Sequence, residues 1–340
     1  MSKQINQLLL FLLFSLSCSS QDVTSPPVLV PDYSLGRVGS ATDVETTTIP
    51  GLVLMGGSTD VDNALAWMVE KSGGGDFVVI RVTGGNGYNT YIQGLGELNS
   101  VETLRIDSKE AANDPKVAAI IKNAEALFIA GGDQSKYIAF WSGSKVQEAI
   151  QYLINEKKVP VGGTSAGCAI MGDFVFTGER GSALSEEALV NPFDEKVTVI
   201  NSALIDYPLL ENTITDQHFA ERDREGRLVV FLAHMAREAE AAVKAIAVDE
   251  KTAVCIEADG SSQVFGLGNA YYLLESDAQN AIEKFEPGES LHWYHDGKAL
   301  IVSIIAGGVL GSKGVNVRSW EIGTGEFWSV SESKLLRVER

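Results

Sequence analysis

The segment VPVGGTSAGC, residues 159–168, constrains the fold of this chain more than any other stretch. A short apolar run ends in two glycines, and Ser165 is followed by small residues that can begin a helix. Gly163-x-Ser165-x-Gly167 fits a nucleophile elbow, a tight strand-to-helix turn that presents a serine oxygen above the edge of a sheet. The tight turn leaves little space around the serine, so the side chains next to it must be small or absent. The alternative is a glycine-rich turn with an ordinary surface serine.

The pattern before this elbow alternates short apolar runs with amphipathic ones. Strands are predicted at residues 51–55, 77–82, 101–106 and 126–130, with a last strand leading into the elbow from 159. Helices are predicted after Ser58 or Thr59 as cap, around 91–98, from Asp114-Pro115 to 122, and over 146–155. Such alternation predicts an α/β fold with a mostly parallel sheet and helices on both faces.

Paired glycines follow four of these strands, at 56–57, 84–85, 131–132 and 162–163. Ligands of parallel sheets bind at the carboxyl ends of the strands, so we expect these loops to surround one crevice. After residue 264 the pattern changes to short strands, predicted at 264–274, 299–305 and 315–322. These are expected to add strands to the same domain.

Composition excludes one class of function. The chain has 340 residues, 45% of them hydrophobic, which suffices for one large domain. Basic residues number 27 and acidic residues 45, so the net charge is 27 − 45 = −18. This balance argues against a protein that binds nucleic acid through its phosphates.

The N-terminus predicts export. Lys3 precedes an apolar core at 8–14 that is too short to span a bilayer, and residues 1–17 fit a secretory signal peptide. Cleavage after Ser17 would leave Cys18 first, an arrangement similar to a bacterial lipoprotein signal in which this cysteine is lipidated. Residues 18–48 are expected to be a tether, and 49–340 a single catalytic domain with a β-rich part at 264–340. The predicted location is the periplasm or cell surface, lipid-anchored to a bacterial membrane, or otherwise secreted.

Two cysteines remain, Cys168 and Cys255, each in an apolar run. They could pair, but nothing in the sequence shows that they are close, and we favour two buried free thiols.

A serine nucleophile needs a base and a group that orients the base. Of the four histidines, His234 lies in an apolar helix, and His292 and His295 lie in a turn-like stretch. His218 instead lies among dense polar residues. An acidic pair, Asp249-Glu250, follows a predicted strand at 245–248, although an acidic pair in a turn is commonly ordinary surface charge. The order serine, histidine, acid differs from that of α/β hydrolases.

Four motifs in this order resemble the cyanophycinase branch of serine peptidase family S51, which has a class I glutamine amidotransferase-like, flavodoxin-like fold. They are GGDQ at 131–134, GTSAG at 163–167, DQHF at 216–219 and DE-x-TA at 249–253. The resemblance implies that Ser165 is the nucleophile, His218 the base and Glu250 the residue that orients the base. Amidotransferases of this fold class have cysteine at the elbow, whereas this chain has serine.

The resemblance also implies an oxyanion hole and a substrate pocket. For the oxyanion hole we expect the amide of Ala166 with one from Gly132 or Asp133. The residues implied in the substrate pocket are Gln134, Asp216, Gln217, Arg222, Arg224 and Arg227. Guanidinium groups among them would suit the carboxylates of an aspartyl substrate.

Cyanophycinases cut a polyaspartate polymer with arginine side groups into β-aspartyl-arginine dipeptides. The resemblance therefore implies acyl transfer by a serine hydrolase that needs no metal or nucleotide, and a homodimer. Two alternatives are an exopeptidase for other aspartyl peptides and a non-catalytic binding lipoprotein. A binding protein has no reason to bring Ser165, His218 and Glu250 together, so their convergence separates the classes.

Overall fold

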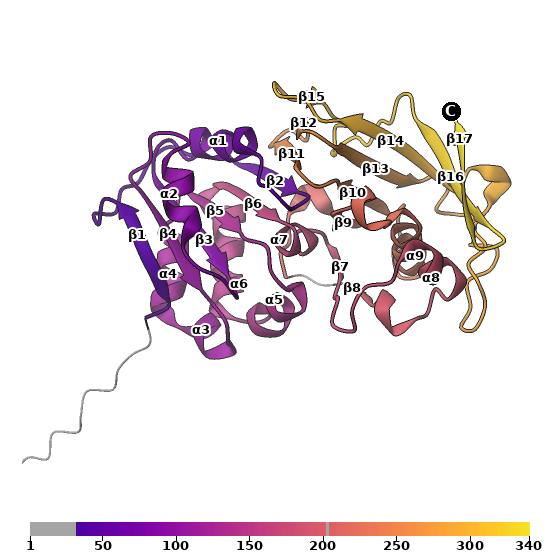
Figure 1. Cartoon of the computed structure of the whole chain (residues 1–340), viewed down its shortest axis with the longest axis horizontal. Helices are drawn as coiled ribbons and strands as arrows, with labels where there is room; N and C mark the ends of the chain where they lie inside the picture. The colour runs from indigo at the N-terminus through magenta and orange to yellow at the C-terminus, as the bar shows by residue number, and fades with distance from the viewer. Residues whose placement is uncertain (1–31, 202–203) are drawn as a thin grey trace, which may run out of the picture. The chain divides into compact units, whose positions relative to one another are not determined.

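Apolar strands form the first of two β-sheets in the computed structural model, and amphipathic helices pack against it (Figure 1). The structure describes residues 32–201 and 204–340, and residues 33–340 form one unit. The expected signal peptide at 1–17 and the expected lipidation site, Cys18, lie outside the described residues.

The first sheet has nine strands in the order β1-β4-β3-β5-β6-β2-β11-β12-β15. Its five central strands, from β4 to β2, are parallel, whereas the strands on either side are antiparallel. In chain order the strands are β1 (Ser34–Gly39), β2 (Gly51–Met55), β3 (Asp76–Arg81), β4 (Ser100–Arg105), β5 (Ala126–Ile129), β6 (Pro160–Thr164), β11 (Thr252–Glu257), β12 (Ser262–Gly266) and β15 (Ser312–Lys313).

Helices cover both faces of this sheet, because alternate residues of its strands point to opposite sides. Leu52 and Leu54 of β2 pack with α3, α4, α5 and α6, while Val53 and Met55 pack with α1 and α2. The helices are α1 (Asp62–Lys71), α2 (Gly87–Gln93), α3 (Lys109–Asn113), α4 (Pro115–Asn123), α5 (Gln134–Trp141) and α6 (Lys145–Tyr152). The predicted α/β fold class with a parallel sheet is confirmed.

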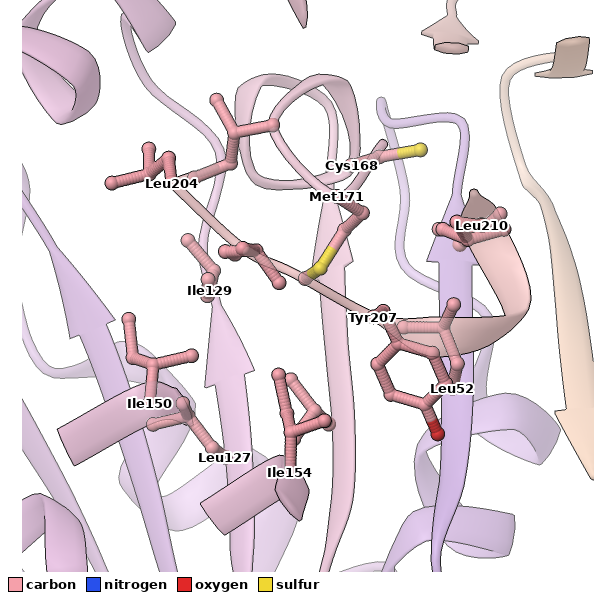
Figure 2. Close-up of a cluster of buried hydrophobic side chains, with 14 of the residues drawn as sticks. Leu52, Leu127, Ile129, Ile150, Ile154, Cys168, Met171, Leu204, Tyr207 and Leu210 are labelled. Atoms are coloured by element: carbon pink, nitrogen blue, oxygen red, sulfur yellow. The ribbon is translucent and has the colours of Figure 1, made fainter. Parts of the chain in front are cut away.

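A buried cluster lies beneath the elbow (Figure 2). Cys168 belongs to the short helix α7 (Ala166–Ala169), and Met171 follows that helix. Both are fully buried, in the same cluster as Ile129 at the end of β5 and Ile150 of α6. A four-residue helix has little stability of its own, so this burial holds it against the sheet.

A second sheet of eight strands was not expected as a separate sheet. Its order is β17-β16-β14-β13-β10-β9-β7-β8, with β9 parallel to β7 and to β10. Helices α8 (Ser185–Val190) and α9 (Glu225–Ala236) contribute to its core. Its strands are β7 (Phe174–Phe176), β8 (Val199–Asn201), β9 (Thr213–Gln217), β10 (Lys244–Val248), β13 (Asn269–Glu275), β14 (Leu300–Ala306), β16 (Glu326–Ser331) and β17 (Lys334–Glu339).

The C-terminal strands differ from the prediction in two places. The apolar run at 264–274 divides between β12 of the first sheet and β13 of the second, with the chain turning at Gly266, whose φ is +112°. The run at 315–322 contains no strand; Val317 and Trp320 are buried apolar anchors of an irregular segment. Apolar residues bury equally well in either conformation, so their pattern alone did not distinguish the two.

Helices α1 and α2 begin at residues other than those predicted. Helix α1 begins at Asp62, with Val61 at its N-cap and no side-chain cap, rather than after Ser58 or Thr59. Helix α2 begins at Gly87, four residues before the predicted start.

The expected tether at 18–48 is too long. Strand β1 pairs with β4 within that segment. The Arg37 guanidinium lies 2.5 Å from the carboxylate of Glu102, and the Ser34 hydroxyl donates to the same carboxylate at 2.6 Å. The segment from Tyr33 therefore belongs to the folded unit, and its Ser/Thr-rich composition concealed an edge strand.

We predict that a shortened chain starting at Tyr33 unfolds at the same temperature as the full chain, whereas one starting at Ile49 is less stable. The second loses the β1–β4 ladder and the ion pair on Glu102, which we expect to cost about 2–4 kcal/mol. Thermal unfolding followed by circular dichroism measures the difference. Equal melting temperatures for the two shortened chains would contradict the assignment of β1 to the folded unit.

Candidate active site

Ser165 follows β6 at the carboxyl edge of the first sheet, in the strand–turn–helix geometry that the elbow pattern predicted. Its φ is 53° and its ψ is −118°, a conformation uncommon for residues other than glycine. Its N–H donates to the carbonyl of Met55 at 3.0 Å, which continues the pairing of β6 with β2 past the strand end. A Cβ on Gly163 would lie 2.6 Å from the carbonyl carbon of Gly167, so the turn closes only with glycine there.

His218 follows β9 of the second sheet and is also in the left-handed region, with φ 47°. Its backbone N–H donates to the carbonyl of Gly56 at 2.9 Å, which joins the two sheets at this point. Its side chain is buried, and its Nε2 lies 2.8 Å from the Oγ of Ser165.

Glu250 follows β10, the parallel neighbour of β9, by two residues. Because Val248 is in register with Gln217, the segments that leave these two strands run side by side. The Oε1 of Glu250 lies 2.6 Å from the Nδ1 of His218. The three side chains named from the motifs thus form a continuous hydrogen-bonded series, serine to histidine to glutamate.

The charges around this series favour a neutral imidazole beside a carboxylate. Burial lowers the pKa of His218 below its ordinary value of 6.5, and Arg222 and Arg224 lower it further, while the bond to Glu250 opposes the shift. The hydrogen bond from His218 lowers the pKa of Glu250. At neutral pH the imidazole can therefore accept a proton from Ser165, with Glu250 holding the other ring nitrogen.

The residues expected at an oxyanion hole lie beside Ser165. A Cβ on Gly131 would be 3.3 Å from the Cβ of Ser165, so the segment 131–133 passes close to the serine. Ala166 is the first residue of α7, where backbone N–H groups have no partner within the helix. The carboxylate of Asp133 is turned away and caps α5 through the N–H of Ser135 at 3.0 Å, so Asp133 can contribute only its backbone there.

Two of the three arginines expected in the substrate pocket form hydrogen bonds with other side chains of the protein. Arg227 is fully buried and donates two hydrogen bonds to Asp216, at 2.5 and 3.1 Å, and one to the hydroxyl of Ser182. Arg224 is also buried, and it donates to the side-chain oxygen of Gln217 at 2.9 Å. Through these contacts Arg224, Arg227, Asp216 and Gln217 brace the end of β9 that carries His218. Contact of these four residues with substrate stays a prediction.

Arg222 and Gln134 lie differently. The side chain of Arg222 is 52% exposed, and its Nη2 lies 3.9 Å from the Oε1 of Glu250. Gln134 opens α5 and is partly exposed, with its Nε2 2.6 Å from where a Cβ of Gly178 would stand. These two side chains remain free to meet a ligand.

Asp249 has a role that sequence reasoning missed. It is buried, and its carboxylate accepts hydrogen bonds from the backbone N–H of Ala220 and of Asn269, each at 2.9 Å. It thereby connects the loop after His218 with β13. A carboxylate directly after a fully apolar strand was the available sign, because a buried acid must have partners.

Neither a metal site nor a membrane-spanning helix is found in the part of the chain that the structure describes. No group of three or more histidine, cysteine or acidic side chains there is placed to hold a metal ion, and no helix there is long and apolar enough to cross a membrane. Cys168 and Cys255 are both free and buried, and burial raises the pKa of each thiol.

A parallel α/β sheet with a strained serine at its edge, bonded to a buried histidine and a glutamate, defines the hydrolases of the elbow type. The family model of peptidase family S51 matches residues 85–264, just over half of the chain. The chain belongs to this family.

Several curated relatives are cyanophycinases. The cyanophycinase of Trichormus variabilis is 31% identical over 53% of this chain and 55% of that protein, and the one of Synechococcus elongatus is 26% identical over 64% and 66%. The chain thus matches between about half and two thirds of the length of these relatives. Among solved structures, a peptidase from an acI-B1 Actinobacterium is 16% identical, with a TM-score of 0.48 over 66% of this chain and 91% of the other.

We predict that Gly57→Ala displaces the imidazole of His218. A Cβ at this position would lie 2.5 Å from both Cε1 and Nε2 of His218, and the φ of +103° also disfavours alanine. We expect the rate at which a fluorophosphonate probe labels Ser165 to fall by about a hundredfold, because the base is misplaced.

Gly85→Ala is the matched control, since a Cβ there meets nothing within 4 Å. Circular dichroism of both variants checks that the fold is kept. Labelling of Gly57→Ala at the rate of the unaltered protein would contradict the contact with His218.

Proposed function

We propose that this chain is an exported serine-type peptidase of the cyanophycinase kind. The observation that supports this best is the hydrogen-bonded series from Ser165 through His218 to Glu250. A surface binding protein has no need for a strained serine beside a buried base, so the arrangement favours the enzyme over a binding lipoprotein.

The proposed reaction is acyl transfer. The Oγ of Ser165 attacks a backbone carbonyl of the substrate and transfers its proton to the Nε2 of His218, while Glu250 stabilises the imidazolium. The oxyanion accepts hydrogen bonds from the amide of Ala166 and from one amide of Gly132 or Asp133. The C–N bond then breaks, the amine leaves with the proton from His218, and water releases the acyl group from Ser165 by the reverse sequence.

The proposed substrate is a polyaspartate with arginine on its side chains, which would be cut to β-aspartyl-arginine. The curated relatives described above are named cyanophycinases, and the chain belongs to peptidase family S51. Arg222 and Gln134 are the side chains of the expected set that are open to a substrate. An exopeptidase for other aspartyl peptides would use the same three residues. Export, lipid attachment at Cys18 and a homodimer remain predictions from the sequence.

We predict that labelling of Ser165 becomes faster as pH rises through a midpoint below 6.5 and is constant above it. The base must be neutral, and the pKa of His218 lies below its ordinary value because of burial and nearby arginines. Arg222→Gln removes one of those charges, so the midpoint should move to higher pH. The control is Arg318→Gln, where the arginine bonds to the carbonyl of Ala258 in the turn after β11. A midpoint that Arg222→Gln leaves unchanged would contradict this electrostatic account.

We predict that the purified chain releases β-aspartyl-arginine from cyanophycin and that Ser165→Ala lowers the rate by about a thousandfold or more. Mass spectrometry of the soluble products measures the release. Labelling of Ser165 without release of the dipeptide would keep the hydrolase and reject the polymer. Absence of both would favour the binding protein.

A further inference from the structure

A cavity of about 490 Å³ lies next to the proposed catalytic residues, and the acyl-transfer steps do not use it. Its walls come from four places: the segment 59–63 after β2, Lys251 after Glu250, and two exposed turns represented by Leu267 and Val309. The volume is within the range of sites that take a small ligand or one residue of a larger one.

Backbone connections place this cavity beside the histidine. The N–H of Lys251 donates to the carbonyl of Gly57 at 3.0 Å, and Gly57 packs on the ring of His218. Ser58 contributes to lowering the pKa of Glu250. Two parts of the cavity wall, Lys251 and the segment 59–63, thus follow in the chain closely on residues that hold or contact His218.

Two carboxylates lie on the wall formed by 59–63. Asp60 accepts a hydrogen bond from the hydroxyl of Tyr88 at 2.7 Å, and Asp62 accepts one from the hydroxyl of Tyr91. Each bond leaves further acceptor positions on its carboxylate. Burial raises the pKa of Asp60, and the hydrogen bond from Tyr88 only partly opposes this. The Asp60 carboxylate would therefore gain from a cation.

A second feature points to the same place. The hydroxyl of Thr164, the residue before the elbow serine, is buried and contributes to lowering the pKa of Asp60, yet among the described residues it completes no hydrogen bond. A buried hydroxyl without a partner is uncommon, and a ligand that draws Asp60 closer would satisfy it.

The part of the lining that comes from the two turns is apolar and exposed. Leu267 is 82% exposed and Val309 is 73% exposed, and Asn63 fixes the second turn by donating to the carbonyl of Val309 at 2.7 Å. Large aliphatic side chains presented to solvent beside a polar wall are typical of a surface that covers the stem of a ligand.

Lys251 adds a cation to the rim. Within the described residues it forms no ion pair with Asp60 or Asp62. The cavity thus offers two carboxylates, an aliphatic wall and an ammonium. A ligand that matches all three has a cation, an aliphatic stem and a free carboxylate.

We propose that this cavity is the subsite for an arginine residue of the substrate that keeps a free α-carboxylate. Its guanidinium would meet Asp60 and Asp62, its methylene groups would lie on Leu267 and Val309, and its carboxylate would face Lys251. A planar guanidinium with five N–H groups fits two carboxylates better than an ammonium does. The inference rests on the proposed function and adds to it the residues that select the side group.

Binding to the Ser165→Ala protein tests the subsite without turnover. The ligands are a trimer of β-aspartyl-arginine and the same trimer with citrulline, a neutral isostere, and isothermal titration calorimetry gives each affinity. We expect the arginine trimer to bind at least tenfold more tightly. Asp60→Asn should weaken the arginine trimer about tenfold and leave the citrulline trimer unchanged, since Asn keeps the bond from Tyr88.

Two further variants keep the result interpretable. Leu267 lies on the surface, so Leu267→Ser should not disturb the fold. We expect it to weaken the binding of both trimers about threefold. Asp43→Asn is the charge-matched control on an exposed residue outside the cavity and should change neither.

Equal affinity for the two trimers, or an equal loss for both on Asp60→Asn, would overturn the subsite. So would the absence of binding by either trimer. A different result would contradict the proposed function: the fluorophosphonate probe would not label Ser165 in the unaltered protein.

Discussion

The imidazole of His218 fits between three groups, and the candidate site depends on that fit. Ser165 bonds one ring nitrogen, Glu250 bonds the other, and the α-carbon of Gly57 closes the side of the ring. The contacts come from the first sheet, the second sheet and the crossing between them. A histidine held at both nitrogens has one tautomer and one orientation, which a general base requires. The relative position of the two sheets is therefore fixed where the chemistry would occur.

Two buried carboxylates hold the second sheet at this junction. Asp216 forms a bidentate pair with Arg227, whose guanidinium also lies over the rings of Phe176 and Phe231 at 4.8 and 5.3 Å. Asp249 takes the N–H groups of two neighbouring segments. Removing one partner of a buried pair costs about 3–5 kcal/mol, because the remaining charge has no solvent to meet it. These acids position His218 and Glu250 without touching the serine.

The sequence predicted the parallel sheet, the elbow and the strand end that carries Glu250, because each rests on local pattern, whereas strand β9 before His218 was not predicted. A strand of five apolar residues, such as Gly51–Met55, or a Pro in a first helical turn, such as Pro115, is specified by its own neighbours. The second sheet was not predictable in this way. Strands β12 and β13 are separated by two residues yet belong to different sheets, and only the crowding at Gly266 against Lys251 shows the chain turning there. The internal partners of Arg224 and Arg227 were not predictable for a related reason: a motif gives residue types, whereas the fold decides that these guanidinium groups meet Gln217 and Asp216.

The crossing between the sheets also explains why the acid of the series is Glu250 and not Asp249. The chain leaves β10 in the second sheet and enters β11 in the first within three residues, so successive side chains there point to different layers. Asp249 points into the second sheet, where buried N–H groups require an acceptor. Glu250 points toward the junction, where the longer side chain reaches the Nδ1 of His218 while remaining partly exposed. The hydrogen bond with His218 lowers the pKa of Glu250, whereas Asp249 accepts its hydrogen bonds from backbone N–H groups. An acidic pair that looks interchangeable in the sequence is thus divided by the fold into one residue that holds the structure and one that faces the base.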